Sequence, residues 1–181
     1  MTISEKAKQE LGLLQIYTGN GKGKTTAALG LAFRASGHGL KILIGQFMKD
    51  TGYYGEEIAA RSIQSITWKT FGRHDFVNLA KPEEIDKKLA LEGWAVAKTA
   101  LNSGEYDMII LDEANVALAC HLIPLEEMLE ALQNRAPHTE VILTGRYAPK
   151  ELLEIADLVT EMTEIRHPYE KQLEARQGIE Y

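Results

Sequence analysis

The sequence predicts an α/β fold, with a single doubly wound, mostly parallel sheet of about six strands and helices on both faces. The first observation is that short apolar runs alternate with helical patterns along the whole chain. The second is a glycine-rich stretch at residues 17–26, which follows an apolar run and opens a helical pattern. The third is size, because 181 residues, of which 45% are hydrophobic and 25% charged, suffice for one domain with a substantial core.

The first residues form a separate feature of the chain. A short helix is expected at residues 3–11, because Ser4 can cap it and Gly12 can end it. We assign this helix no place in the core. We therefore divide the chain into an N-terminal helical arm at residues 1–12 and an α/β nucleotide-binding domain at residues 13–181.

In the first half of the domain, strands are expected at residues 13–17, 41–48 and 66–71. The second of these is almost entirely apolar, so we expect both of its faces to be covered. Helices are expected at residues 25–36, where a Gly-His-Gly sequence follows, and near residues 56–62.

In the second half, Pro82 opens a long helix to about residue 102. Gly93 in its middle lowers helix stability by about 1 kcal/mol relative to alanine. We therefore expect a packing reason for it, namely another side chain that lies close to the helix there. Further helices are expected from Pro124, where leucine and methionine recur at helical spacing, and at residues 149–156. Apolar runs predict the three remaining strands at residues 108–111, 141–143 and 158–165.

Composition narrows the functional classes. The net charge is −6 at pH 7 and no long basic run is present, so a dedicated nucleic-acid binder is a poor fit. Cys120 is the only cysteine, which excludes an intrachain disulfide and a cysteine-rich zinc site. Residues 1–10 lack the apolar core of a signal peptide, and no apolar run approaches the ~20 residues of a membrane span. We expect a cytoplasmic protein without a membrane or nucleic-acid partner.

The glycine-rich stretch has the context of a phosphate-binding loop, with a strand before it and a helix after it. Its glycines allow successive backbone N–H groups to point inward at an anion, and the helix start adds further N–H groups. One alternative is a glycine-rich β-turn that merely precedes a lysine. The spacing is one residue shorter than the usual G-x-x-x-x-G-K-[ST] pattern, but the context favours a fold like that of P-loop NTPases. The residues expected to bind the phosphates are Gly19, Asn20, Gly21, Lys22, Gly23, Lys24, Thr25 and Thr26.

Two carboxylates end the most apolar expected strand, at Asp112 and Glu113. A carboxylate at this place can hold Mg²⁺, directly or through water, opposite the hydroxyl of Thr25. The alternative is that the aspartate caps a helix. The sequence leaves open which of the two carboxylates touches the ion.

Other polar side chains follow the expected strands at the same edge of the sheet. Arg146 is expected to pair with phosphates or with the two carboxylates, and the alternative is an ordinary surface arginine. Lys49 and Gln46 have a similar claim, and Arg166 and His167 a weaker one.

Aromatic side chains in loops on this side of the sheet suit a flat, largely apolar second substrate, although they could also be ordinary loop residues. The candidates are Tyr53, Tyr54, His74 and Phe76. Both tryptophans, Trp68 and Trp94, are assigned to packing. No Ser-His-Asp or Cys-His arrangement is evident, so we expect catalysis by positioning two substrates.

From about Leu13 to the C-terminus, the sequence resembles the ATP:corrinoid adenosyltransferase family. The resemblance rests on the short phosphate loop, on Leu-Asp-Glu at 111–113, on Leu-Thr-Gly-Arg at 143–146, and on the tail from His167 to the final Gly-Ile-Glu-Tyr. The shortened loop is typical of this family.

The resemblance implies transfer of the 5′-deoxyadenosyl group of ATP to the Co(I) of a corrinoid, with triphosphate leaving. It implies Mg²⁺ as cofactor, a reductase that supplies electrons, and a homodimer in which the arm of one subunit covers the neighbour's site. On this basis we assign catalysis to Lys24, Thr25 and Glu113. Many relatives have Phe-Thr-Trp after the third strand, whereas this chain has Gly-Arg-His-Asp-Phe at 72–76, so His74 and Phe76 are assigned by position only.

Two other functions remain open at this stage. One is a P-loop kinase or NTPase that cleaves the β–γ bond of ATP. The other is a regulatory module that binds a nucleotide without turnover. Adenosyl transfer yields triphosphate, phosphoryl transfer or hydrolysis yields ADP, and a pure binder yields neither.

Overall fold

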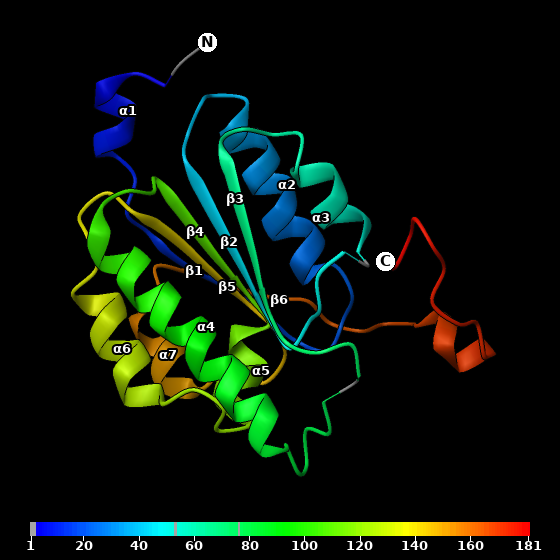
Figure 1. Cartoon of the computed structure of the whole chain (residues 1–181). Helices are drawn as coiled ribbons and strands as arrows, with labels where there is room; N and C mark the ends of the chain where they lie inside the picture. The colour runs from blue at the N-terminus through cyan, green and yellow to red at the C-terminus, as the bar shows by residue number, and fades with distance from the viewer. Residues whose placement is uncertain (1–2, 53, 76) are drawn as a thin grey trace.

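The computed structural model describes residues 3–181 except 53 and 76, and the side chains of 170 and 171 are likewise left aside. It contains one six-stranded sheet in the order β3-β2-β4-β5-β1-β6, in which every pair of neighbours is parallel (Figure 1). The α/β fold class and the single sheet are therefore confirmed. The strands are β1 Leu14–Thr18, β2 Ile42–Phe47, β3 Ile66–Phe71, β4 Met108–Asp112, β5 Glu140–Thr144 and β6 Leu158–Glu161.

Helices cover both faces of the sheet. Helices α2 and α3 lie on one face, and α4, α5, α6 and α7 lie on the other (Figure 1). The helices are α1 Glu5–Gln9, α2 Lys24–Ser36, α3 Gly55–Ala60, α4 Glu84–Ser103, α5 Ala114–Ala119, α6 Leu125–Gln133 and α7 Lys150–Ile155, followed by the 3₁₀ turn η1 Pro168–Lys171.

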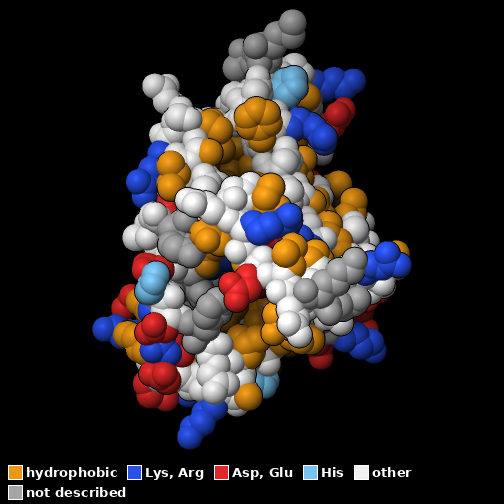
Figure 2. Space-filling model, turned by 90° about the vertical axis from the view of Figure 1, so that its right-hand side faces the viewer, with side chains coloured by type: hydrophobic (Ala, Val, Ile, Leu, Met, Phe, Trp, Pro, Cys, Tyr) orange, Lys and Arg blue, Asp and Glu red, His pale blue; other side chains and the backbone are white. Residues whose placement is uncertain are grey.

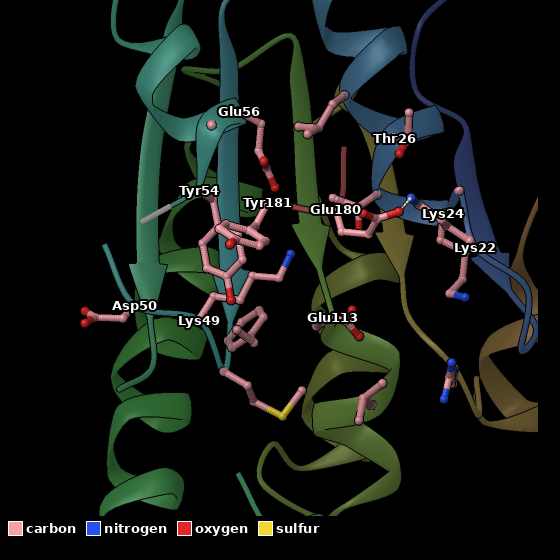
Figure 3. Close-up of a pocket in the computed structure, with 18 of the residues that line it drawn as sticks. Lys22, Lys24, Thr26, Lys49, Asp50, Tyr54, Glu56, Glu113, Glu180 and Tyr181 are labelled. Carbon is pink, nitrogen blue, oxygen red and sulfur yellow. Dashed lines mark hydrogen bonds and ion pairs between the residues drawn. The ribbon is translucent and has the colours of Figure 1, made fainter. Parts of the chain in front are cut away.

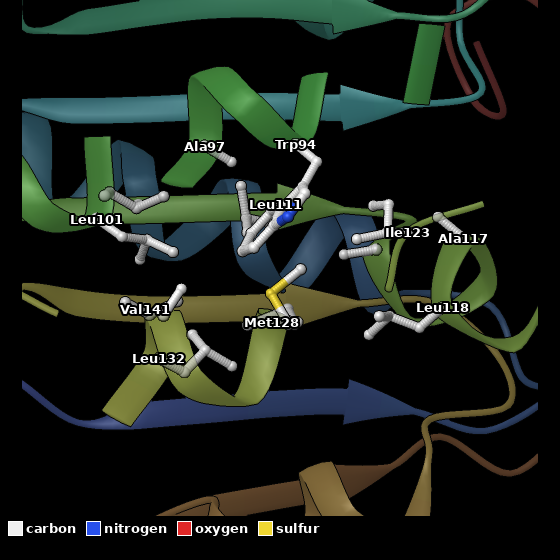
Figure 4. Close-up of a cluster of buried hydrophobic side chains, with 14 of the residues drawn as sticks. Trp94, Ala97, Leu101, Leu111, Ala117, Leu118, Ile123, Met128, Leu132 and Val141 are labelled. Carbon is white, nitrogen blue, oxygen red and sulfur yellow. The ribbon is translucent and has the colours of Figure 1, made fainter. Parts of the chain in front are cut away.

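The central strands contribute to two hydrophobic clusters, one on each face. Leu111 of β4 points into the larger cluster with α4 and α6 (Figure 4), to which Ile109 also belongs, and Ile110 belongs to the smaller one with α2. Successive side chains of a strand alternate between faces, so burial of all of them requires apolar residues throughout. This explains the uninterrupted apolar runs. Trp94 is buried in the larger cluster and Trp68 packs against the smaller one, as expected.

The glycine in the middle of α4 is explained by its contact with β3. A Cβ added at Gly93 would lie 2.4 Å from Cγ of Phe71, a separation that side chains do not show. The close packing expected at this glycine is confirmed.

Two elements differ from expectation. Helix α5 was not predicted, because it has six residues and follows Glu113, whose left-handed φ of 59° carries no sequence signal. Strand β6 was predicted at residues 158–165 but ends at Glu161. After Glu161, the N–H of Met162 still donates to Thr18 of β1, and its carbonyl oxygen accepts from Gly21 of the phosphate loop.

The N-terminal arm packs on its own chain, contrary to our expectation that it has no place in the core. Ile3 and Leu11 contact the smaller cluster, and Lys8 forms an ion pair of 3.1 Å with Asp107. Ser4 caps α1 as predicted, accepting a bond from the backbone of Ala7. The arm lies at the end of the sheet opposite the carboxyl ends of the strands, so it does not cover the phosphate loop of its own chain (Figure 1).

Candidate active site

The phosphate loop connects β1 to α2, and its curvature depends on glycine. A Cβ at Gly19 would lie 2.5 Å from the carbonyl oxygen of Met162, and a Cβ at Gly21 would lie 2.7 Å from the same atom. The N–H of Gly21 donates to that oxygen over 2.6 Å, and the N–H of Met162 donates to Thr18 over 2.9 Å. The end of β6 therefore supports the loop from behind, and glycines are needed where the two backbones meet.

Lys24 begins α2 and is held inside the loop. Its Nζ donates to the carbonyl oxygens of Gly19 and Gly21, each over 2.7 Å. Burial lowers the pKa of Lys24, although the nearby carboxylate of Glu113 acts in the opposite direction. The ammonium is thus enclosed by loop carbonyls at the place where an anion would meet the helix start.

Asp112 is the centre of a buried hydrogen-bond network. Its Oδ1 accepts from the hydroxyls of Thr25 over 2.8 Å and Thr144 over 2.6 Å. Its Oδ2 accepts from Nε2 of Gln46 over 2.9 Å and Nζ of Lys49 over 3.0 Å. Burial alone would raise the pKa of Asp112, but the charge of Lys49 and these hydrogen bonds outweigh it and hold the pKa below its ordinary value.

Glu113 has the opposite electrostatic character. Burial and the neighbouring charge of Asp112 raise its pKa. It adopts a left-handed backbone conformation between β4 and α5, and its side chain lines the cavity described below. Adjacent carboxylates are thus held in different states, one fully hydrogen-bonded and the other facing the cavity.

These groups fit Mg²⁺ held together with a polyphosphate. The Thr25 hydroxyl hydrogen is directed at Asp112, so its oxygen lone pairs are free for a cation. Glu113 offers a carboxylate to the same cavity. Within the described residues no group of three or more His, Cys, Asp and Glu side chains could enclose a metal, so most ligands would come from phosphates and water.

The loop, the carboxylates and the expected second-substrate region surround one cavity of about 1160 Å³. Apolar, basic and acidic side chains gather around a hollow on this face of the molecule (Figure 2). In the close-up view, Glu180 and Tyr181 lie between the lysines of the loop and the side chains of Lys49 and Tyr54 (Figure 3). The cavity joins a strongly polar end to a wall with aromatic and aliphatic side chains.

The structure brings most of the predicted residues to this cavity. Arg146 lines it and donates to the carbonyl oxygen of Asn20 over 3.3 Å. Tyr54 lines it, with its ring centroid 5.0 Å from Nζ of Lys49. His74 and His167 also line it, whereas Arg166 is an exposed residue of the tail. Tyr53 and Phe76 lie outside the described residues.

The C-terminal tail is the part of the cavity that reasoning from residue types missed. Residues 178–181 line it, and Glu180 forms an ion pair of 2.8 Å with Lys22. Hydrogen bonds from Arg176 and Lys22 lower the pKa of Glu180 to about 2. The final Gly-Ile-Glu-Tyr entered the sequence analysis only through the family resemblance, because nothing local indicates a contact between positions this far apart.

A second omission is Tyr147, which directly follows Arg146 and also lines the cavity. The signal was a large aromatic residue after a strand-end arginine.

No helix in the described part of the chain is long and apolar enough to cross a membrane.

Two solved structures share the fold of this chain. The flagellar accessory protein FlaH from Methanocaldococcus jannaschii matches with a TM-score of 0.54 at 14% identity, covering 83% of this chain and 71% of that one. The ATPase EscN of the enteropathogenic E. coli type III secretion system matches with a TM-score of 0.53 at 15% identity, covering 89% and 45%. At such identities the likeness shows the fold alone.

Sequence relatives are more specific. A corrinoid adenosyltransferase of Escherichia coli (strain K12) is 37% identical, covering 97% of this chain and 89% of the relative. The corrinoid adenosyltransferase CobA of Salmonella typhimurium is 35% identical over the same shares. A family profile described as ATP:corrinoid adenosyltransferase BtuR/CobO/CobP matches residues 10–181. The chain therefore belongs to the ATP:corrinoid adenosyltransferase family.

Proposed function

We propose that this protein transfers the 5′-deoxyadenosyl group of ATP to the cobalt of a corrinoid and releases triphosphate. The observation that carries the proposal is that one cavity joins the phosphate loop and a metal-compatible pair of side chains to apolar and aromatic walls. This arrangement accommodates a polyanion and a broad apolar substrate side by side. The relatives named above carry the same activity in their names.

In the reaction, Co(I) attacks C5′ of ATP, a Co–C bond forms, and the C5′–O bond breaks with its electron pair leaving on triphosphate. Because the cobalt is the nucleophile, the protein needs no nucleophilic side chain. Stabilisation of the departing triphosphate is then the main catalytic task. We assign it to the loop N–H groups, Lys22, Lys24 and Arg146, which surround the polar end of the cavity.

Thr25 and Glu113 would hold Mg²⁺, which when bound neutralises charge on the phosphates. Asp112 keeps the Thr25 hydroxyl in the required orientation. Its own oxygens already accept from four donors, so we assign the direct carboxylate contact to Glu113 and a positioning role to Asp112.

We place the corrinoid at the apolar end, against Tyr54 and the segment after β3. His74 and Val77 of that segment line the cavity. Tyr53 and Phe76 stay candidates by sequence position only. The proposal also includes a reductase that delivers electrons to the cobalt, a homodimer, and a cytoplasmic location.

Product analysis tests the function. Purified protein is incubated with Mg²⁺-ATP and chemically reduced cob(I)alamin, and the nucleotide products are separated by anion-exchange chromatography. We expect adenosylcobalamin and triphosphate in equal amounts, formed only when both substrates are present. Formation of ADP independently of the corrinoid would instead identify a kinase or NTPase, and binding without any product would identify a regulatory module.

A further inference from the structure

Tyr147 occupies a backbone conformation that is unusual for its side chain. Its φ is 61°, in the left-handed region that glycine and asparagine visit easily and bulky residues rarely do. The turn is fixed by the preceding Gly145, with φ 127°, where a Cβ would lie 3.1 Å from the backbone nitrogen of Val116. The fold therefore places a large aromatic residue at a position that favours a small one. Such outliers are concentrated at functional sites.

Folding does not explain the ring. Tyr147 is 59% exposed and is not among the side chains that form either hydrophobic cluster. The strained backbone lowers the stability of the fold. The ring adds no core packing that would offset this loss.

The position of the ring suggests what it contacts. Tyr147 lines the phosphate cavity and also a second cavity of about 660 Å³ on the side of the molecule where α4 meets α5 and α6. The second cavity has mainly apolar walls, which include Leu91, Leu122 and Ile123, with Lys87 and His121 among its polar residues. The ring thus stands where the polar site next to Arg146 gives way to apolar surface.

We propose that Tyr147 is a specificity-determining residue whose ring packs against the corrin macrocycle beside the triphosphate site. This inference rests on the proposed function. A macrocycle with a largely apolar face gains from a flat aromatic surface, and its amide substituents would find polar partners at the second cavity. ATP contacts the other end of the site and does not depend on the ring.

The test uses Tyr147→Gly, with Tyr147→Phe as the matched control. Glycine adopts the left-handed conformation without strain, so the proposal predicts a melting temperature that is unchanged or raised in Tyr147→Gly. If the ring had a merely structural role, its loss would lower the melting temperature. We expect the KM for cob(I)alamin and the dissociation constant of cob(II)alamin, the latter from spectrophotometric titration, to rise about tenfold. The KM for ATP should stay within about twofold, and Tyr147→Phe should restore the corrinoid values because it keeps the ring.

The outcomes separate the inference from the function on which it rests. An unchanged cob(II)alamin dissociation constant in Tyr147→Gly would overturn the role of the ring. A parallel rise of both KM values with a lowered melting temperature would also overturn it, since the loss would then be structural. Absence of adenosylcobalamin from the wild-type reaction would overturn the proposed function itself.

Discussion

Lys22 in the phosphate loop and Glu180 in the C-terminal tail form an ion pair of 2.8 Å, which joins positions 158 residues apart at the mouth of the cavity. A carboxylate therefore stands beside a loop cation. Since Glu180 is also bonded to Arg176, its charge persists to about pH 2. Any polyphosphate entering the loop meets this negative charge.

We predict that Glu180→Gln lowers the KM for ATP by about twofold to threefold at low ionic strength, because the competing carboxylate is removed. The difference should shrink at high salt, which screens exposed charges. Steady-state kinetics at two salt concentrations measure both effects. A higher KM would mean that Glu180 helps to bind ATP.

The neighbouring carboxylates should respond oppositely to neutralisation in the ATP-free protein. The pKa of Asp112 is lowered, so its charge stabilises the fold above its ordinary pKa, and Asp112→Asn leaves the buried Lys49 ammonium without its ion-pair partner. We expect a loss of about 3 kcal/mol in the free energy of unfolding at pH 7. The pKa of Glu113 is raised, so its ionisation opposes folding, and Glu113→Gln should raise the free energy of unfolding.

Urea denaturation between pH 3 and pH 8 checks both signs. The deficit of Asp112→Asn should begin to shrink as pH falls below about 4, where Asp112 of the unfolded wild-type takes up a proton, and should vanish only below the lowered pKa of the folded protein. The gain of Glu113→Gln should also disappear below about pH 4, where the wild-type glutamate is protonated in both states. Equal changes of the same sign in the free energy of unfolding of the two variants would contradict the assigned electrostatics.

The metal ligands are tested by titrating Mg²⁺. Thr25→Ala and Glu113→Gln should each raise the Mg²⁺ concentration for half-maximal activity about tenfold, because each removes an oxygen ligand. Thr99→Ala is the matched control, since its hydroxyl bonds only within α4, to the carbonyl oxygen of Ala95. Titration curves that coincide with wild-type in both variants would rule out this metal site.

Two helix glycines should respond oppositely to alanine. At Gly93 a Cβ collides with Phe71, so Gly93→Ala should destabilise the fold by about 1–3 kcal/mol. At Gly30 of α2 a Cβ meets nothing within 4 Å, so Gly30→Ala should stabilise it by about 0.5–1 kcal/mol. Thermal denaturation of the ATP-free proteins compares the two. Stabilisation by Gly93→Ala would show that the helix moves away from β3.

Deletion of residues 2–11 tests the arm. Because the arm lies at the end of the sheet opposite its own phosphate loop, direct coverage of an ATP site would have to come from the arm of a neighbouring subunit in the proposed homodimer. For the proposed homodimer we expect a KM for ATP raised about tenfold without dissociation of the subunits, with a small loss of stability from the contacts of Ile3 and Leu11. An unchanged KM in a dimeric truncated protein would remove the arm from the site.

The strands and the phosphate loop were predictable because their signals are local. Strand β3 was predicted with its observed bounds, since β-branched and aromatic residues occur over a strand length after a helix and a turn. The loop glycines predicted in the same way the tight turn between β1 and α2. By contrast, the order of the strands depends on crossovers that no local pattern encodes.

The remaining site features depend on contacts between distant segments. The sequence placed Lys49 and Asp112 at strand ends, but their ion pair follows from β2 and β4 being neighbours in the sheet. The contact of Glu180 with Lys22 depends on the path of an irregular tail. The strain at Tyr147 is a property of its backbone conformation, which the residue type does not indicate.

The contact between the phosphate loop and the end of β6 has a consequence for protein engineering. Since Gly19 and Gly21 face the backbone of residues 162–163, the shortened loop and the last strand form one structural unit. Transplanting the loop into another ATPase scaffold would require transplanting Met162 and its neighbours as well. Lengthening the loop to the usual spacing would require an accompanying change at the sheet edge, so the two segments have to be redesigned together.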